Sequence, residues 1–232
     1  MEILEYGDRD AAMVLLQMVD DHDLETIENE VALIGEQTGM PFRLIACKVQ
    51  DWNVELSPWT APPVFGNQPF GDGAQETLRA ILPLCEDQTK TYYIGGYSLA
   101  GLFALWAVYQ TDRFQGAAAA SPSMWFPGFV DHMKTAAIKS RNVYLSLGKK
   151  EEKTRNKVMA AVGDRIREAE ALLKTQGVHC VLEWNEGNHF RDADRRTARA
   201  FSWVMQQSRS FFVRNQTKLD EKHGDKIKYN KK

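Results

Sequence analysis

The stretch that most restricts the fold of this chain runs from Tyr92 to Trp106 and reads YYIGGYSLAGLFALW. Its first residues form a β-type apolar run, and the residues from Leu99 onwards are strong helix formers. A buried strand must therefore become a buried helix within very few residues. The small residues on either side of Ser98 permit such a tight turn.

The rest of the chain alternates between strand-like and helix-like segments, which is typical of an α/β domain with a mainly parallel sheet. Besides the strand near 92–94, we predict strands at about 12–19, 42–49, 115–120, 142–147 and 178–184, and helices at about 24–39, 74–86, 166–177 and 192–212. Asp23 is the predicted N-cap of the first helix, and Pro83 is expected to kink or end the second. The aromatic segment at 51–73 shows neither period and is predicted to be a long functional loop.

Length and composition fit one domain. With 232 residues, 44% of them hydrophobic, the chain can bury a sizeable core, and we expect a single domain at 1–213 and a polar tail at 214–232. A net charge of -2 argues against nucleic-acid or anionic-membrane partners. The amino terminus lacks the pattern of a secretory signal, and no apolar run approaches the roughly 20 residues of a membrane span. We therefore expect a cytoplasmic protein; no feature predicts an oligomeric state.

The three cysteines are widely spaced and lie in apolar or mixed segments. Cys47, Cys85 and Cys180 are accordingly predicted to be reduced core residues. The sequence contains neither metal-ligand spacing nor a phosphate-binding loop. No metal and no cofactor are therefore expected.

Ser98 lies at the centre of Gly96 to Ala100, which matches the nucleophile elbow G-x-S-x-G except for alanine at the last position. In that elbow the serine hydroxyl is exposed on a strained turn, at the positive end of a helix. Serine is also among the best N-cap residues, so Ser98 could instead cap the helix that begins at Leu99. The pentapeptide alone does not separate these two interpretations.

A nucleophilic serine in this arrangement is followed along the chain by an acid and then by a histidine. Among the five histidines, only His189 lies in a loop between the last predicted strand and the final helix. Glu151 directly follows the strand at 142–147 and is the preferred acid, with Glu152 as the alternative. Either glutamate could be an ordinary solvated carboxylate, and His189 could instead cap the final helix.

The predicted topology also indicates where a substrate would be held. A tetrahedral oxyanion needs two backbone N–H donors, one from Leu99 and one from the loop after the strand at 12–19, where Asp20 and Asp21 are the candidates. Two aromatic loops fall on the same carboxyl edge of the sheet, where such folds bind ligands. Their tryptophans are expected to line the pocket, the alternative being simple packing: Trp52, Trp59 and Trp125.

Several stretches between residues 12 and 207 resemble the esterase family of the α/β-hydrolase superfamily that includes esterase D-like and enterochelin esterase-like enzymes. They are GGYSLAGLFALW, ASPSMWF, YLSLGKKEEKTRN, GNHF and DWNVELSPWTAP. The resemblance implies a three-layer α/β-hydrolase fold with Ser98, Glu151 and His189 as a triad. The chain departs from the family at Ala100 and begins close to the strand at 12–19, so we expect additional edge strands to be missing and the site to be open.

These features together predict a serine hydrolase that cleaves small-molecule carboxylic esters through an acyl-enzyme. The same triad would serve a thioesterase or an acyltransferase, because all three reactions share that intermediate. Amide cleavage is less favoured. A non-catalytic binding protein that keeps the fold is a further alternative, against which the order serine, acid, histidine argues.

Overall fold

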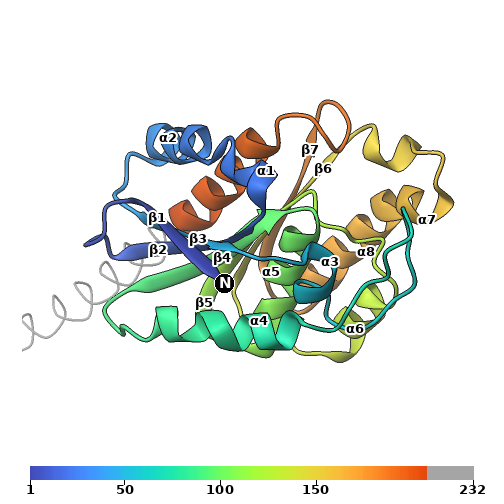
Figure 1. The fold of residues 1–232 in the computed structure, drawn as a ribbon, viewed down its shortest axis with the longest axis horizontal. Coiled ribbons are helices and arrows are strands. Elements are labelled where there is room, and N and C mark those ends of the chain that lie inside the picture. Colours follow the sequence, from blue (N-terminus) through green and yellow to red (C-terminus); the bar gives the residue numbers. More distant parts are fainter. Residues whose placement is uncertain (208–232) are drawn as a thin grey trace, which may run out of the picture.

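The computed structural model describes residues 1–207, and this part of the chain forms a seven-stranded sheet with helices on both faces (Figure 1). The strands are β1 (Glu2–Gly7), β2 (Met13–Val19), β3 (Arg43–Lys48), β4 (Thr91–Tyr97), β5 (Phe114–Ala120), β6 (Asn142–Gly148) and β7 (His179–Asn185). Their order across the sheet is β1-β3-β2-β4-β5-β6-β7. Only β1 is antiparallel to its neighbour, so the predicted, mainly parallel sheet is confirmed.

The helices divide into two layers. They are α1 (Asp21–Leu24), α2 (Ile27–Thr38), α3 (Trp52–Glu55), α4 (Ala74–Ile81), α5 (Leu99–Gln110), α6 (Phe129–Thr135), α7 (Lys157–Ala160), α8 (Val162–Thr175) and an unlabelled helix at 193–207, with 3₁₀ turns η1 (Leu82–Cys85) and η2 (Glu151–Lys153). The α2 helix and the helix at 193–207 cover one face, whereas α4, α5, α6 and α8 cover the other (Figure 1). The result is the predicted three-layer arrangement.

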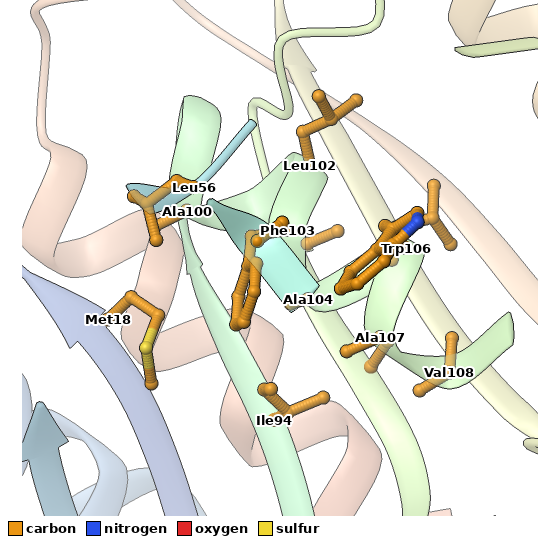
Figure 2. Packing of buried hydrophobic residues seen from close by; sticks show 14 of the residues in the cluster. Met18, Leu56, Ile94, Ala100, Leu102, Phe103, Ala104, Trp106, Ala107 and Val108 are labelled. Atoms are coloured by element: carbon orange, nitrogen blue, oxygen red, sulfur yellow. The ribbon is translucent and has the colours of Figure 1, made fainter. Parts of the chain in front are cut away.

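The α5 helix is the centre of the larger core. All its residues from Leu99 to Tyr109 are buried, as is typical of a helix that is apolar on every side. In Figure 2, Phe103 points from α5 toward the side of the sheet that carries Met18 of β2 and Ile94 of β4. This packing fixes the start of α5, and with it the turn at Ser98, against the sheet.

The edge of the sheet differs from the prediction. We expected no additional edge strand before the strand at 12–19, and that expectation was wrong, because β1 pairs with β3 along its whole length. Its side chains alternate, with Leu4 and Tyr6 packing against the core and their neighbours exposed to solvent. Such a half-buried strand lacks the continuous apolar run by which β2 was predicted.

Two helical details also differ. The predicted helix at about 24–39 corresponds to α2, whose N-cap is Thr26 and not Asp23. Asp20 is the N-cap of the separate short helix α1, and it forms a capping box with Asp23 at the start of that helix. The aromatic segment at 51–73 contains α3 and an isolated bridge between Ala61 and Phe70, and the rest of it is irregular. The helix predicted at about 74–86, with Pro83 expected to kink or end it, ends as α4 at Ile81, and the 3₁₀ turn η1, which contains Pro83, follows it.

Other predictions concern the whole chain. All three cysteines are free, with Cys47 and Cys85 buried and Cys180 half-buried, as predicted. Within residues 1–207, no helix is both long and apolar enough to cross a membrane. The predicted boundary at residue 213, the tail at 214–232 and the end of the final helix lie outside the described residues.

Candidate active site

Ser98 lies in the turn between β4 and α5, in a backbone conformation that is unfavourable for a residue with a side chain. Its φ is 58° and its ψ is -120°, a strain of about 1–3 kcal/mol that persists only where the surroundings impose it. The Ser98 amide donates to the carbonyl of Ala120, and the Ser98 carbonyl accepts from the amide of Ser123, both at 3.1 Å. The side chain makes no capping hydrogen bond, so the helix-cap interpretation does not hold.

The glycines around Ser98 make this turn possible. A Cβ atom on Gly96 would lie 2.6 Å from the Cβ of Ala100, and one on Gly101 would lie 3.0 Å from the carbonyl oxygen of Gly96. Both distances are far shorter than normal carbon contacts. The alanine that replaces the second glycine of the elbow therefore fits because Gly96, which it faces, has no side chain.

Ser98, His189 and Glu151 form one hydrogen-bonded chain. The Ser98 Oγ lies 2.9 Å from His189 Nε2, and His189 Nδ1 lies 2.7 Å from Glu151 Oε2. Ser98 follows β4, Glu151 lies in η2 after β6, and His189 follows β7. In the sheet β5 lies between β4 and β6, and β7 is next to β6, so the ends of these parallel strands bring the three groups to one edge. In this arrangement the imidazole, supported by the carboxylate, can remove the proton from the hydroxyl.

Glu151 is buried, and its Oε1 atom, which does not face His189, accepts three hydrogen bonds. Glu151 Oε1 accepts from the Gly148 amide at 2.7 Å, the Ser121 hydroxyl at 2.9 Å and Arg196 Nη1 at 3.0 Å. Burial by itself raises the pKa of Glu151, but the hydrogen bond and charge of His189, with the bonds from Gly148 and Ser121, hold that pKa below its ordinary value. The carboxylate is therefore ionised at neutral pH.

The alternative acid, Glu152, points elsewhere. Its carboxylate pairs with Arg167 at 3.0 Å, and both side chains are partly exposed. Neither of its hydrogen bonds reaches the histidine loop. The structure thus brings Glu151, and not Glu152, to His189.

Three residues around the site were not singled out from the sequence: Tyr97, Ser121 and Arg196. The Tyr97 hydroxyl donates to the backbone carbonyl of His189 at 2.7 Å and accepts from Arg196 at 3.0 Å. Burial, followed by the charge of Glu151, raises the pKa of Tyr97 to about 12, so the phenol remains protonated and able to donate. Two of these residues could have been identified from their positions, because Tyr97 directly precedes Ser98 and Ser121 is the first residue of the loop after β5.

The candidate oxyanion donors differ in availability. Leu99 is the first residue of α5, where backbone N–H groups have no partner within the helix. The Asp20 amide already donates to the Asp23 carboxylate at 3.2 Å. Asp21 is the first residue of α1, where a backbone N–H has no partner within the helix. Its carboxylate pairs with Lys48 and does not occupy this amide. Because β2 adjoins β4, this loop and Ser98 share one edge of the sheet.

A cavity of about 480 Å³ lies beside His189 and Glu151. Its lining residues come from the loops after β5, β6 and β7 and the start of α8: Ser121, Pro122, Trp125, Lys150, Glu151, Lys153, Thr154, Met159, Val162, Asn188, His189 and Phe190. Trp125 is the predicted tryptophan that lines this cavity. The Trp59 indole instead donates to the Pro127 carbonyl at 2.9 Å and stacks on Phe129, and Trp52 packs against the core at α3. Packing is therefore the observed role of these two.

A metal site is not apparent in the described part of the chain. Among residues 1–207, no group of three or more histidine, cysteine, aspartate or glutamate side chains is arranged to hold an ion.

The strand order, the turn at Ser98 and the three-layer arrangement define an α/β-hydrolase fold, and solved structures share it. No family model matches the chain, and no curated protein matches it by sequence. The siderophore hydrolase EstA from Aspergillus nidulans is 21% identical, with a TM-score of 0.60, over 88% of this chain and 85% of that one. An IroE-like serine hydrolase from Shewanella oneidensis is 14% identical, with a TM-score of 0.68, over 85% and 72%.

A third similar structure is the enterobactin esterase FES from Shigella flexneri, which is 14% identical with a TM-score of 0.63. The match covers 88% of this chain and 55% of that protein. These neighbours agree with the resemblance to enterochelin esterase-like enzymes that the sequence stretches indicated. At such identities the comparisons establish the fold.

Proposed function

We propose that this protein is a serine hydrolase that cleaves small-molecule carboxylic esters through an acyl-enzyme. The observation that carries the proposal is the hydrogen-bonded chain from Ser98 through His189 to Glu151, which begins on a strained turn. Strain of this kind is retained where it serves a site. The structural neighbours, a siderophore hydrolase, an IroE-like serine hydrolase and an enterobactin esterase, support the same reaction.

In this mechanism Ser98 Oγ attacks the ester carbonyl while His189 Nε2 takes its proton. The tetrahedral oxyanion accepts hydrogen bonds from the Leu99 amide and, we infer, from the Asp21 amide. When the intermediate collapses, His189 delivers the proton to the leaving alcohol. Glu151 holds the imidazole with its proton on Nδ1 and stabilises the imidazolium. A water molecule then repeats the sequence on the acyl-enzyme and releases the acid.

The cavity indicates what kind of ester fits. A volume of about 480 Å³ lies in the range that holds a small organic ligand. Trp125, Met159 and Val162 supply apolar walls, and Lys150 and Lys153 are also among the lining residues. We infer that an apolar or aromatic part of the ester occupies this cavity.

The proposal is tested with purified protein, short p-nitrophenyl esters and a fluorophosphonate probe. We expect hydrolysis that Ser98→Ala lowers by about 10⁴ to 10⁶ fold in kcat. Mass spectrometry should find the probe on the peptide that contains Ser98. If the wild-type protein were no faster than Ser98→Ala and took no label, or carried the label on another residue, the proposal would be refuted.

A further inference from the structure

Arg196 is a buried cation directly behind the Ser98–His189–Glu151 chain. It comes from the helix at 193–207, and 3% of its side chain is exposed. A buried charge is costly by several kcal/mol unless it is paired and its donors are satisfied. Both conditions are met here, because Glu151 neutralises the charge and the two terminal guanidinium nitrogens donate to oxygen acceptors.

The five hydrogen bonds of Arg196 join segments that are far apart in the sequence. Its Nη1 donates to the Tyr97 hydroxyl at 3.0 Å, the Ser121 hydroxyl at 3.2 Å and Glu151 Oε1 at 3.0 Å. Its Nη2 donates to the backbone carbonyls of Glu186 at 3.0 Å and Asn188 at 3.1 Å. One planar group therefore connects the end of β4, the loop after β5, the acid and the histidine loop.

These contacts restrict both partners of His189. Because Glu151 Oε1 is held by Arg196 and two other donors, only Oε2 faces His189 Nδ1. Because Arg196 also holds the carbonyl of Asn188, next to His189 in the chain, the backbone of the histidine loop cannot move away without breaking that contact. Tyr97, itself bonded to Arg196, holds the carbonyl of His189.

We propose that Arg196 is a positioning residue for the ester hydrolysis proposed above, on which this inference rests. It holds the Glu151 carboxylate and the backbone of the histidine loop in place, so that His189 can contact both Glu151 and Ser98. Arginine suits this task because its planar fork offers several fixed donors, whereas lysine is a single point charge.

The test measures kcat and KM separately for wild type, Arg196→Met, Arg196→Lys and the control Arg195→Met, with active sites counted by the fluorophosphonate probe and folding checked by thermal melts. Arg195 precedes Arg196 on the same helix and is exposed, so its replacement should change nothing. We expect Arg196→Met to lower kcat per active site by about 100-fold at an unchanged KM, since small misplacements of reacting groups have effects of that order. Arg196→Lys should restore part of this loss, because lysine keeps the charge beside Glu151 but lacks the fixed fork of donors.

The results separate this inference from the proposed function. If wild type hydrolysed no ester, the function itself would fail, whatever the variants did. If wild type were active and folded Arg196→Met kept the wild-type kcat, or lost activity only through a raised KM, the inference would be overturned. If Arg196→Met did not fold, Arg196→Lys would decide, and a wild-type kcat in that variant would overturn the inference.

Discussion

Glu151→Gln should damage the site by moving the imidazole proton of His189 from Nδ1 to Nε2. Glutamine has one accepting oxygen and one donating nitrogen where glutamate has two acceptors. Three donors face Oε1 of Glu151, from Gly148, Ser121 and Arg196. The glutamine oxygen will therefore take that position, and its NH₂ group will face Nδ1 of His189.

The size of the effect follows from that orientation. An NH₂ group opposite Nδ1 makes Nδ1 an acceptor and places the imidazole proton on Nε2, 2.9 Å from Ser98 Oγ. In the proposed mechanism Nε2 must receive the serine proton, so the protonated Nε2 can no longer act as the base, and the carboxylate charge is lost as well. An amide in place of the triad acid of a serine protease lowers kcat by about 10⁴, and we expect a loss of about 10³ to 10⁴.

Glu152→Gln is the matched control. It removes one ion pair with Arg167 between partly exposed side chains, which is worth about 0 to 1 kcal/mol of stability. It leaves His189 untouched, and kcat should change by less than about twofold.

The assay measures kcat for both variants on a p-nitrophenyl ester, with thermal melts to show that both are folded. Equal, small losses in the two variants would refute the assignment of Glu151 as the acid. A larger loss in Glu152→Gln would transfer the role to the alternative residue.

Three further outcomes are expected. Gly96→Ala should lower the free energy of unfolding in urea by about 1–3 kcal/mol, because its methyl would lie 2.6 Å from Ala100 Cβ, whereas Gly35→Ala, with open space in α2, should raise it by about 0.5–1 kcal/mol. Burial and the charge of its capping-box partner raise the pKa of Asp23 from 3.8 to about 6, so ionised Asp23 destabilises the folded state above that pH. Asp23→Asn should therefore raise the free energy of unfolding at pH 8 by about 1–3 kcal/mol, and the gain should disappear below pH 4; a constant gain would contradict this reasoning. Trp125→Ala should raise KM about tenfold for esters with a bulky apolar group and much less for acetate, as the loss of one cavity wall requires.

Most of the sheet could be predicted because its inner strands are buried on both faces. Such strands are continuous apolar runs, and β2 and β6 lie within one or two residues of their predicted bounds. The edge strand β1 was not predicted because alternate side chains face solvent, so it has no continuous apolar run. The N-cap at Asp20 was missed because Asp20 and Asp23 are both good caps, and only the three-dimensional path of the loop selects one.

The chain Ser98, Glu151, His189 was predictable for a topological reason. The carboxyl ends of parallel strands meet at one edge of the sheet. Residues that directly follow β4, β6 and β7 therefore lie close together whatever the sequence around each of them. The tryptophans carry no such constraint. An aromatic residue in a long loop serves packing or a pocket equally well, and Trp59 differs from Trp125 only through the partners that the folded loops provide.

Arg195 and Arg196 show what a sequence pattern can and cannot reveal about the site. Both residues have the same chemistry, yet one is exposed and the other buried. Arg196, Ala200, Phe201 and Val204 fall on one face of the helix, at the spacing of an apolar stripe, so the pattern places Arg196 at a core position. An arginine there requires a partner, because an unpaired buried cation would be unstable. The pattern cannot identify that partner, because Glu151 lies 45 residues away in the chain and meets Arg196 only after the sheet has formed.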